Sequence, residues 1–335
     1  MKIKVIAIII AIIILNVAYP FISHLAWAQS TTTLFVNPQA TTVLVGESFT
    51  ISVDVANVSD LVGYNIYLRY NTTVLTATQV IVDNTWFTAG QPYTVWVNSI
   101  NDVQGVVQAT VTLTGVEEGV SGSGDLFLVV FSSDNSGSSF LDLYNDALVD
   151  PTFVSIPHST SDGAVQVKAH DVAVKGIVTS KTLVGQGFTV DIDVTVENEG
   201  DFTETLNVAV YANNTLIELE ELTLANRSRR TITITWNTSS WAKGNQTIKA
   251  VVAQVPDETD TLDNTFTYGI VLVTVQGDVN GDKTVDMFDI LKIKYDRSGP
   301  PAGPGGYDPN VDIDYDGAID VFDILIAKAH LGQSW

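Results

Sequence analysis

Residues 45–55 are Val45-Gly46-Glu47-Ser48-Phe49-Thr50-Ile51-Ser52-Val53-Asp54-Val55, a glycine turn that leads into an alternation of apolar and polar side chains. Alternation with a period of two is typical of a β-strand with one buried face. The same alternation occurs in residues 64–70, with apolar Tyr64, Ile66, Leu68 and Tyr70. It occurs again in residues 107–113, with apolar Val107, Ala109, Val111 and Leu113. Short strands of this kind continue from Thr31 to about Gln276, without a convincing amphipathic helix. Clusters of turn-forming residues, such as Ser132–Ser139 and Ser159–Gly163, are predicted to separate them. This pattern predicts antiparallel β-sandwiches.

A weak internal repeat divides this region into two domains. The stretch Val184-Gly185-Gln186-Gly187-Phe188-Thr189-Val190-Asp191-Ile192-Asp193-Val194 is similar to residues 45–55. In each copy a glycine turn precedes an early core strand, so two sandwiches in series explain the length better than one. We expect the first sandwich at 31–168 and the second at 170–275. The composition then changes, and residues 276–335 form a third segment.

The composition excludes several classes of function. The chain has 335 residues and carries 16 Lys and Arg against 38 Asp and Glu, a formal charge of −22. A charge of this sign repels nucleic acid and favours cations and basic surfaces. Because cysteine is absent, disulfides and thiolate metal sites are excluded.

The N-terminus indicates export. Lys2 and Lys4 precede the apolar run Val5–Leu15, and Ala26-Trp27-Ala28 suits cleavage, so we expect residues 1–28 to be a signal peptide and the protein to be secreted or on the cell surface. The alternative is an uncleaved anchor, in which case the chain contacts a membrane. N-glycosylation sequons fit an exported chain, and they lie at Asn57, Asn71, Asn213, Asn226, Asn237 and Asn245.

An acidic repeat carries the chemistry of the third segment. Loop one, residues 278–289, and loop two, residues 312–323, place side-chain oxygens at positions one, three, five, nine and twelve. Calcium takes six to eight oxygen ligands, and EF-hand-type loops supply them at this spacing, with a backbone carbonyl at position seven. We therefore predict two Ca²⁺ ions. Their ligands are Asp278, Asn280, Asp282, Thr284, Asp286 and Asp289 in loop one, and Asp312, Asp314, Asp316, Ala318, Asp320 and Asp323 in loop two, with Thr284 and Ala318 acting through their carbonyls.

Two features depart from the EF-hand pattern. Position twelve is Asp in both loops, where an EF-hand has the longer Glu. Position six of loop one is Lys283, where glycine normally relieves the sharp turn. The connector between the loops, residues 296–310, is rich in proline and glycine, and we expect it to be a loop.

An Asp at position twelve, followed by Ile-Leu and a later Lys, resembles the repeats of type I dockerins. The matching strings are Asp289-Ile290-Leu291 with Lys294 and Asp323-Ile324-Leu325 with Lys328. The resemblance implies a small α-helical module that binds a cohesin in a calcium-dependent manner. Loop positions ten and eleven help dockerins to choose their partner, and with the two lysines they give the candidate partner-binding residues, Met287, Phe288, Val321, Phe322, Lys294 and Lys328. Exposed, these apolar pairs form a contact patch; buried, they hold the two halves together.

The two sandwiches also resemble known modules. The first is similar to cohesin-type domains through residues 45–55, 63–75, 124–131 and 162–165. The second resembles immunoglobulin-like adhesion modules of the CARDB type through residues 194–200 and 260–266, and such modules are usually spacers or adhesion units. The resemblances imply the modules of a cellulosome, a complex active in polysaccharide catabolism.

We therefore expect a non-catalytic scaffold, adaptor or adhesion protein. Its partner is a cohesin-bearing protein or the cohesin-like head of another copy; dockerin-bearing proteins or polysaccharide remain possible partners of the head. The alternative is a carbohydrate-binding accessory protein, which exposed aromatic residues of the first sandwich would favour; the candidates are Trp86, Tyr93 and Trp96. Enzyme motifs are absent from the sequence, and neighbouring acids such as Glu117-Glu118 and Glu220-Glu221 point to opposite faces of a strand.

Overall fold

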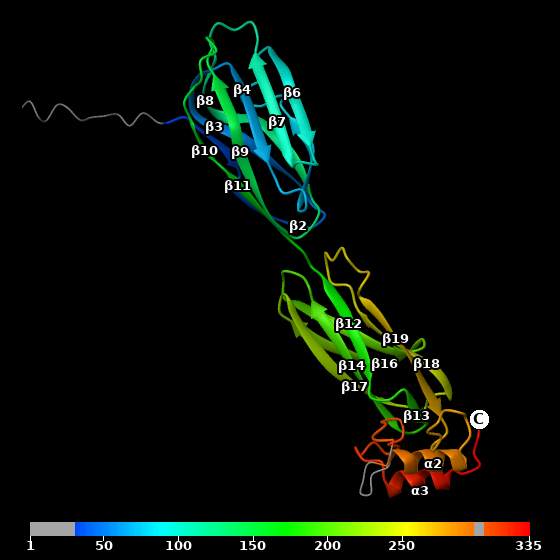
Figure 1. The fold of residues 1–335 in the computed structure, drawn as a ribbon. Helices are drawn as coiled ribbons and strands as arrows, with labels where there is room; N and C mark the ends of the chain where they lie inside the picture. Colours follow the sequence, from blue (N-terminus) through cyan, green and yellow to red (C-terminus); the bar gives the residue numbers. More distant parts are fainter. Residues whose placement is uncertain (1–30, 298–304) are drawn as a thin grey trace, which may run out of the picture. The chain divides into compact units, whose positions relative to one another are not determined.

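The computed structural model describes residues 31–297 and 305–335 and has strands in two successive regions, followed by two helices (Figure 1). This confirms the predicted fold class. The expected signal peptide, residues 1–28, and part of the connector between the loops lie outside the described residues. Within the described residues, no helix is long and apolar enough to cross a membrane. The chain forms two compact units that meet between Val167 and Lys168.

The first unit is a sandwich of two sheets. One sheet has the strand order β10-β1-β3-β8-β5 and the other β2-β11-β9-β4-β7-β6. The strands are β1 Thr33–Asn37, β2 Ala40–Leu44, β3 Ser48–Leu61, β4 Gly63–Arg69, β5 Leu75–Ile81, β6 Tyr93–Asn101, β7 Val106–Leu113, β8 Val120–Ser133, β9 Gly137–Val149, β10 Ser159–Ser161 and β11 Gly163–Lys168.

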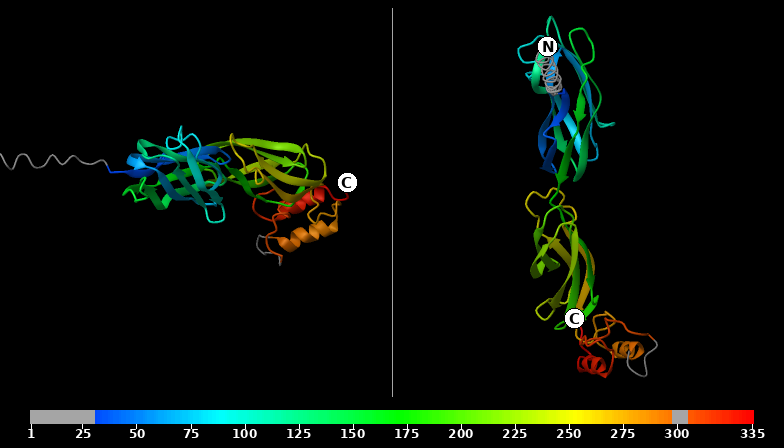
Figure 2. Two further views of the ribbon diagram at one scale, coloured as in Figure 1. Left: turned by 90° about the horizontal axis from the view of Figure 1, so that it is seen from above. Right: turned by 90° about the vertical axis from the view of Figure 1, so that its left-hand side faces the viewer.

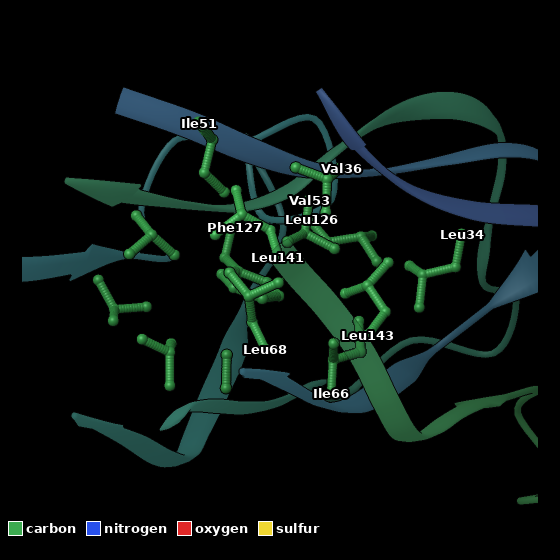
Figure 3. Packing of buried hydrophobic residues seen from close by; sticks show 14 of the residues in the cluster. Leu34, Val36, Ile51, Val53, Ile66, Leu68, Leu126, Phe127, Leu141 and Leu143 are labelled. Carbon is green, nitrogen blue, oxygen red and sulfur yellow. The ribbon is translucent and has the colours of Figure 1, made fainter. Parts of the chain in front are cut away.

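The core of this sandwich follows from the alternation in its sequence. In β4 and β7 every second residue is buried, which places Ile66 and Leu68 opposite Ala109 and Val107 in the antiparallel register. The inward side chains of both sheets meet in one cluster, part of which is visible in Figure 3, where Leu34, Val36, Ile51, Val53, Ile66, Leu68, Leu126, Phe127, Leu141 and Leu143 fill the space between the strands. These two layers account for the stability of the unit.

One segment that the sequence indicates as a turn is a strand instead. The cluster at Ser159–Gly163 contains β10, which pairs in parallel with β1 from Thr33 to Phe35. The prediction of a turn was wrong because small hydroxyl side chains also suit a short strand at the edge of a sheet. Gly163 then packs so closely on Val36 that a Cβ would lie 2.7 Å from its Cγ1.

The second unit contains another sandwich and the helical tail. The sandwich has the sheets β12-β14-β17 and β13-β19-β18-β15-β16. Its strands are β12 Val172–Thr179, β13 Leu183–Gly185, β14 Thr189–Asn198, β15 Glu204–Ala212, β16 Thr215–Leu224, β17 Ser228–Asn237, β18 Gly244–Val252 and β19 Thr265–Thr274. The repeated stretches 45–55 and 184–194 lead into β3 and β14, and each of these strands pairs with a neighbour on both sides.

The tail has two helices, α2 Met287–Asp296 and α3 Val321–Ala329, which lie side by side in both views of Figure 2. A small apolar cluster lies beneath them and includes Val279, Val285, Ile290 and Ile319. Phe188 of the sandwich packs against this cluster as well as against the core of its own domain.

Candidate calcium sites in the tail

The predicted ligands of the two acidic loops have the same pattern of burial. Positions one and twelve are buried, positions three and five are exposed, and positions seven and nine are half-buried in both loops. The buried ends are Asp278 and Asp289 in loop one and Asp312 and Asp323 in loop two. Because carboxylates are almost never buried without a partner, the repeated pattern points to a function for these four groups.

The Asp at position twelve links each loop to the helix that follows it. Asp289 Oδ1 accepts from the backbone of Val279 at 2.9 Å, and its Oδ2 accepts from the backbone of Asp286 at 2.9 Å. Asp323 does the same with Ile313 at 2.6 Å and Asp320 at 2.7 Å. The shorter carboxylate therefore reaches the start of its loop, and it also forms part of the capping box of its helix.

Position nine caps the same helices. The side chains of Asp286 and Asp320 each accept a 2.7 Å hydrogen bond, from the backbone of Phe288 and Phe322 respectively. Each helix consequently begins inside its loop, and the acidic first turn faces the partial positive charge at the helix N-terminus.

In both loops, positions four and six have left-handed backbone conformations. Loop one has Gly281 with φ 77° and Lys283 with φ 78°, and loop two has Tyr315 with φ 62° and Gly317 with φ 88°. Lys283 therefore adopts the conformation that normally requires glycine, as the sequence suggested. Each loop has one glycine for two such positions, and the glycine has changed place between the loops.

Loop two shows the clearest signs of a cation site. The carboxylates of Asp312, Asp314 and Asp323 each offer an oxygen within 4.8 Å of the others. Asp312 Oδ2 accepts from Gly317 N at 3.0 Å and from the Tyr307 hydroxyl at 2.9 Å, whereas Asp312 Oδ1 is buried without a hydrogen-bond partner. A buried carboxylate oxygen without a partner costs free energy unless a cation satisfies it. These residues therefore fit a bound divalent cation with oxygen ligands.

The electrostatics of the loops point the same way. Burial raises the pKa of Asp323, and the charges of Asp314 and Asp312 add to the increase against the backbone hydrogen bonds that lower it. Burial also raises the pKa of Asp314, with the charge of Asp316 as the next cause. The pKa of Asp289 is raised by burial and by Asp278, while three backbone hydrogen bonds oppose this. The carboxylates of each loop thus repel one another, and neutralising their charge would stabilise the loop.

Loop one differs at its first position. Asp278 Oδ1 accepts from Gly281 N at 2.7 Å, and Oδ2 accepts from Lys283 N at 3.0 Å and from the Thr274 hydroxyl. Asn280 at position three gives this loop one carboxylate fewer than loop two. The side-chain oxygens of loop one still occupy the same loop positions as those of loop two.

The candidate partner-binding residues lie on the surface. Met287, Phe288, Val321 and Phe322 are all more than half exposed, between 51% and 68%. Leu291 and Tyr295 on α2 and Leu325 on α3 extend the same stripe, since they follow at helical spacing and are 50%, 56% and 53% exposed. Lys294 and Lys328 are also exposed, each in the last turn of its helix. Sequence reasoning missed the three added apolar residues, although their helical spacing was a signal for them.

The remaining predicted sites are spread over both sandwiches. All six sequon asparagines are exposed. The acids Glu117, Glu118, Glu218, Glu220 and Glu221 are exposed as well. Two histidines that stand alone in sequence have acidic partners in the fold, since His158 contacts Asp146 and His170 Nδ1 lies 2.6 Å from Glu204 Oε1.

Of the aromatic candidates on the first sandwich, one is mostly exposed. Trp86 and Tyr93 pack against the core, and a Cβ at Gly124 would lie 2.2 Å from the ring of Trp86. Trp96 is 68% exposed and donates to Thr112 Oγ1 at 2.8 Å. These three side chains therefore do not form the row of exposed aromatic residues that would favour the carbohydrate-binding alternative.

Comparison with known proteins agrees with the geometry of the tail. The family model described as "Dockerin type I domain" matches residues 276–332. Curated proteins give no match to this chain.

Solved structures similar to this chain include several cohesins. One is a non-cellulosomal cohesin from Archaeoglobus fulgidus, with 20% identity and a TM-score of 0.34, over 41% of this chain and 91% of that chain. Another is the sixth cohesin of scaffoldin B from Acetivibrio cellulolyticus, in complex with a dockerin, with 14% identity and a TM-score of 0.35, over 41% of this chain and 99% of that chain. With its two calcium-type loops and its family match, the segment 276–332 is a dockerin type I domain.

Proposed function

We propose that this chain is an exported, non-catalytic adaptor that assembles with other proteins through a calcium-loaded dockerin. The observation that carries this proposal is the buried, unpartnered Oδ1 of Asp312, which lies among the carboxylates of loop two. Two ions would be held by the twelve predicted ligands, six in each loop. The ions would supply the positive charge that allows these carboxylates to stay together.

The exposed apolar stripe supports a protein partner. Seven large apolar side chains face solvent on two short helices, and they are Met287, Phe288, Leu291, Tyr295, Val321, Phe322 and Leu325. A contiguous apolar surface on a small domain is typical of a protein-binding face. In the Acetivibrio cellulolyticus structure a cohesin is bound to a dockerin. Because residues 276–332 match the dockerin type I model, we propose a cohesin-bearing protein as the partner.

The first sandwich of a second copy is one candidate for this cohesin. On its sheet β9-β4-β7-β6 the outer surface carries Phe140, which is 77% exposed, and the pair Tyr67 and Tyr144, whose ring centroids are 5.5 Å apart. Arg69 lies 4.3 Å above the ring of Tyr144. An exposed aromatic surface of this kind complements the apolar stripe of the tail.

Calcium titration of the full chain tests the proposal. We expect calorimetry to report two ions and circular dichroism to report a gain of helix on loading. Sedimentation with calcium and with chelator then tests assembly, and a Phe140→Asp variant tests the sandwich surface. A chain that takes up no calcium at millimolar concentration would contradict the proposal.

A further inference from the structure

The second sandwich contacts loop two through a buried lysine. Lys181, between β12 and β13, is 3% exposed, and its Nζ donates to the main-chain carbonyl of Asp312, the first residue of the loop. The same Nζ lies 4.8 Å from the centroid of the Tyr315 ring. A lysine is almost never buried so completely unless its ammonium is held by partners, so this contact fixes one position of the loop relative to the sandwich.

Further hydrogen bonds join the same two segments. Asn310 Oδ1 accepts from the backbone of Thr182 at 2.8 Å and of Leu183 at 3.0 Å. The hydroxyl of Tyr315 donates to Asp191 Oδ2 at 3.2 Å. The sandwich therefore holds the residue that enters loop two and the residue at its fourth position.

Loop one contacts the sandwich through Thr274 at the end of β19, and the last residues of the tail hold it as well. Val285 N donates to Gln333 O at 2.9 Å, and Gly332 N donates back to Val285 O at 2.8 Å. Thr284 and Ser334 form an antiparallel bridge in the same place. The two loops are similar in sequence and burial, but different parts of the chain support them.

We infer that the second sandwich is a working part of the docking module, in which Lys181 and Asn310 are positioning residues for the cation site of loop two. The inference rests on the proposed function, because it concerns how the same site is prepared. By holding the loop entry and the Asp312 carbonyl in place, the sandwich reduces the ordering that loop two needs to bind calcium. This role differs from that of a spacer.

Hydrogen exchange of the full chain tests the contact without relying on calcium uptake. In an Asn310→Ala variant, the amides of Thr182 and Leu183 lose their acceptor, and we expect them to exchange roughly tenfold faster than in the parent chain. The matched control is Asn101→Ala, which removes a similar bond to Gln104 N in the first sandwich. Equal exchange at residues 182 and 183 in the two variants would overturn the inference.

Calcium affinity separates this inference from the proposed function. We expect Asn310→Ala to weaken calcium binding at one of two sites by roughly tenfold and Asn101→Ala to leave both unchanged. If Asn310→Ala binds calcium as tightly as the parent chain, the inference is overturned and the proposed function is unaffected. A parent chain that takes up no calcium, with fast exchange of residues 182 and 183 in Asn310→Ala, would refute the proposed function and keep the structural contact.

If Asn310→Ala does not fold, a Lys181→Met variant tests the same inference. Lys181→Met keeps the length of the side chain and removes the donor to Asp312, and we expect faster exchange over residues 311–320 with chelator present. Its control is Lys175→Met, because Lys175 pairs with Glu199 at 2.7 Å and with Asp263 at 2.9 Å within the sandwich. If the amides of residues 311–320 exchange at equal rates in Lys181→Met and Lys175→Met, the supporting role of Lys181 is refuted.

Discussion

Trp335 Nε1 donates a 2.9 Å hydrogen bond to Thr274 Oγ1, so residues on either side of the dockerin sequence are joined in space. Thr274 is fully buried, and its hydroxyl donates a hydrogen bond to Asp278, the first predicted ligand of loop one. Lys283 Nζ lies 4.9 Å over the Trp335 ring. The indole of Trp335 thus contacts both the Lys283 side chain of loop one and the Thr274 hydroxyl that donates to this loop.

Trp335→Ala should therefore destabilise the tail. The variant leaves a buried hydroxyl with one partner fewer and removes apolar contact, for a loss of about 1–3 kcal/mol. Thermal unfolding of the calcium-loaded full chain, followed by the helical signal, measures this. The control is Trp96→Ala, whose indole is 68% exposed on the first sandwich. If the tail unfolds at the same temperature in both variants, the Trp335 indole contributes nothing to the stability of the tail.

Asp289→Ala together with Asp323→Ala should abolish the calcium-induced gain of helix. Each substitution removes a buried predicted ligand and the acceptor of two or three backbone N–H groups, including one at the helix start. The loss of the cap alone is worth about 0.5–2 kcal/mol per helix. Circular dichroism with calcium and with chelator gives the result, and Glu221→Ala, at an exposed position of β16, is the control. A double variant that still gains helix on adding calcium would contradict the dockerin interpretation.

We expect Phe288 and Phe322 to replace one another in partner binding, so that either half of the tail can bind the partner. They occupy the same loop position and are 68% and 57% exposed. If either half can present its face, Phe288→Ala or Phe322→Ala alone should weaken calcium-dependent association only a few-fold, whereas the double variant should weaken it more than about a hundredfold, since loss of a buried aromatic anchor costs on the order of 2–4 kcal/mol. Sedimentation of the full chain measures this. Association of the double variant at the strength of the parent would refute the role of the stripe.

Asp171 should make the second sandwich less stable at neutral pH than at acidic pH. Burial, and then the charges of Asp263 and Glu199, raise its pKa from 3.8 to about 6. The folded chain therefore holds this proton more tightly than the unfolded chain, so stability falls as the pH rises from about 4 to about 6 and the loss is complete above that range.

Asp171→Asn removes this effect. We expect a higher unfolding temperature than the parent near pH 7.5 and no difference near pH 4, where the carboxyl is protonated in both states. Glu221→Gln, on the exposed side of β16, controls for the change in net charge. A gain in stability that persists unchanged near pH 4 would mean that the carboxylate charge is not its cause.

The sequence predicted most of the fold because the alternation of side chains determines which face of each strand is buried. The four residues Tyr64, Ile66, Leu68 and Tyr70 were read from this alternation, and all are at most 5% exposed. Ser159–Ser161 escaped prediction because an edge strand of three residues has too little apolar character to show a period.

For the tail, spacing gave a set of predicted ligands but no indication of which residues support the loops. Lys181 lies 131 residues before Asp312, in a short polar stretch that has the composition of a turn. A contact of that length depends on how the sandwich and the tail pack, and neither local propensity nor periodicity carries this information. The exposure of positions ten and eleven was open for the same reason, since it depends on which face of each helix covers the small core.

The left-handed residues at loop positions four and six have a consequence for recognising such loops in other sequences. One glycine in either place is compatible with the turn, because Gly281 with Lys283 and Tyr315 with Gly317 build the same backbone. A search pattern that insists on glycine at position six finds loop two and overlooks loop one. A pattern that accepts it at either position would recover both, and would count the loops of divergent tandem repeats correctly.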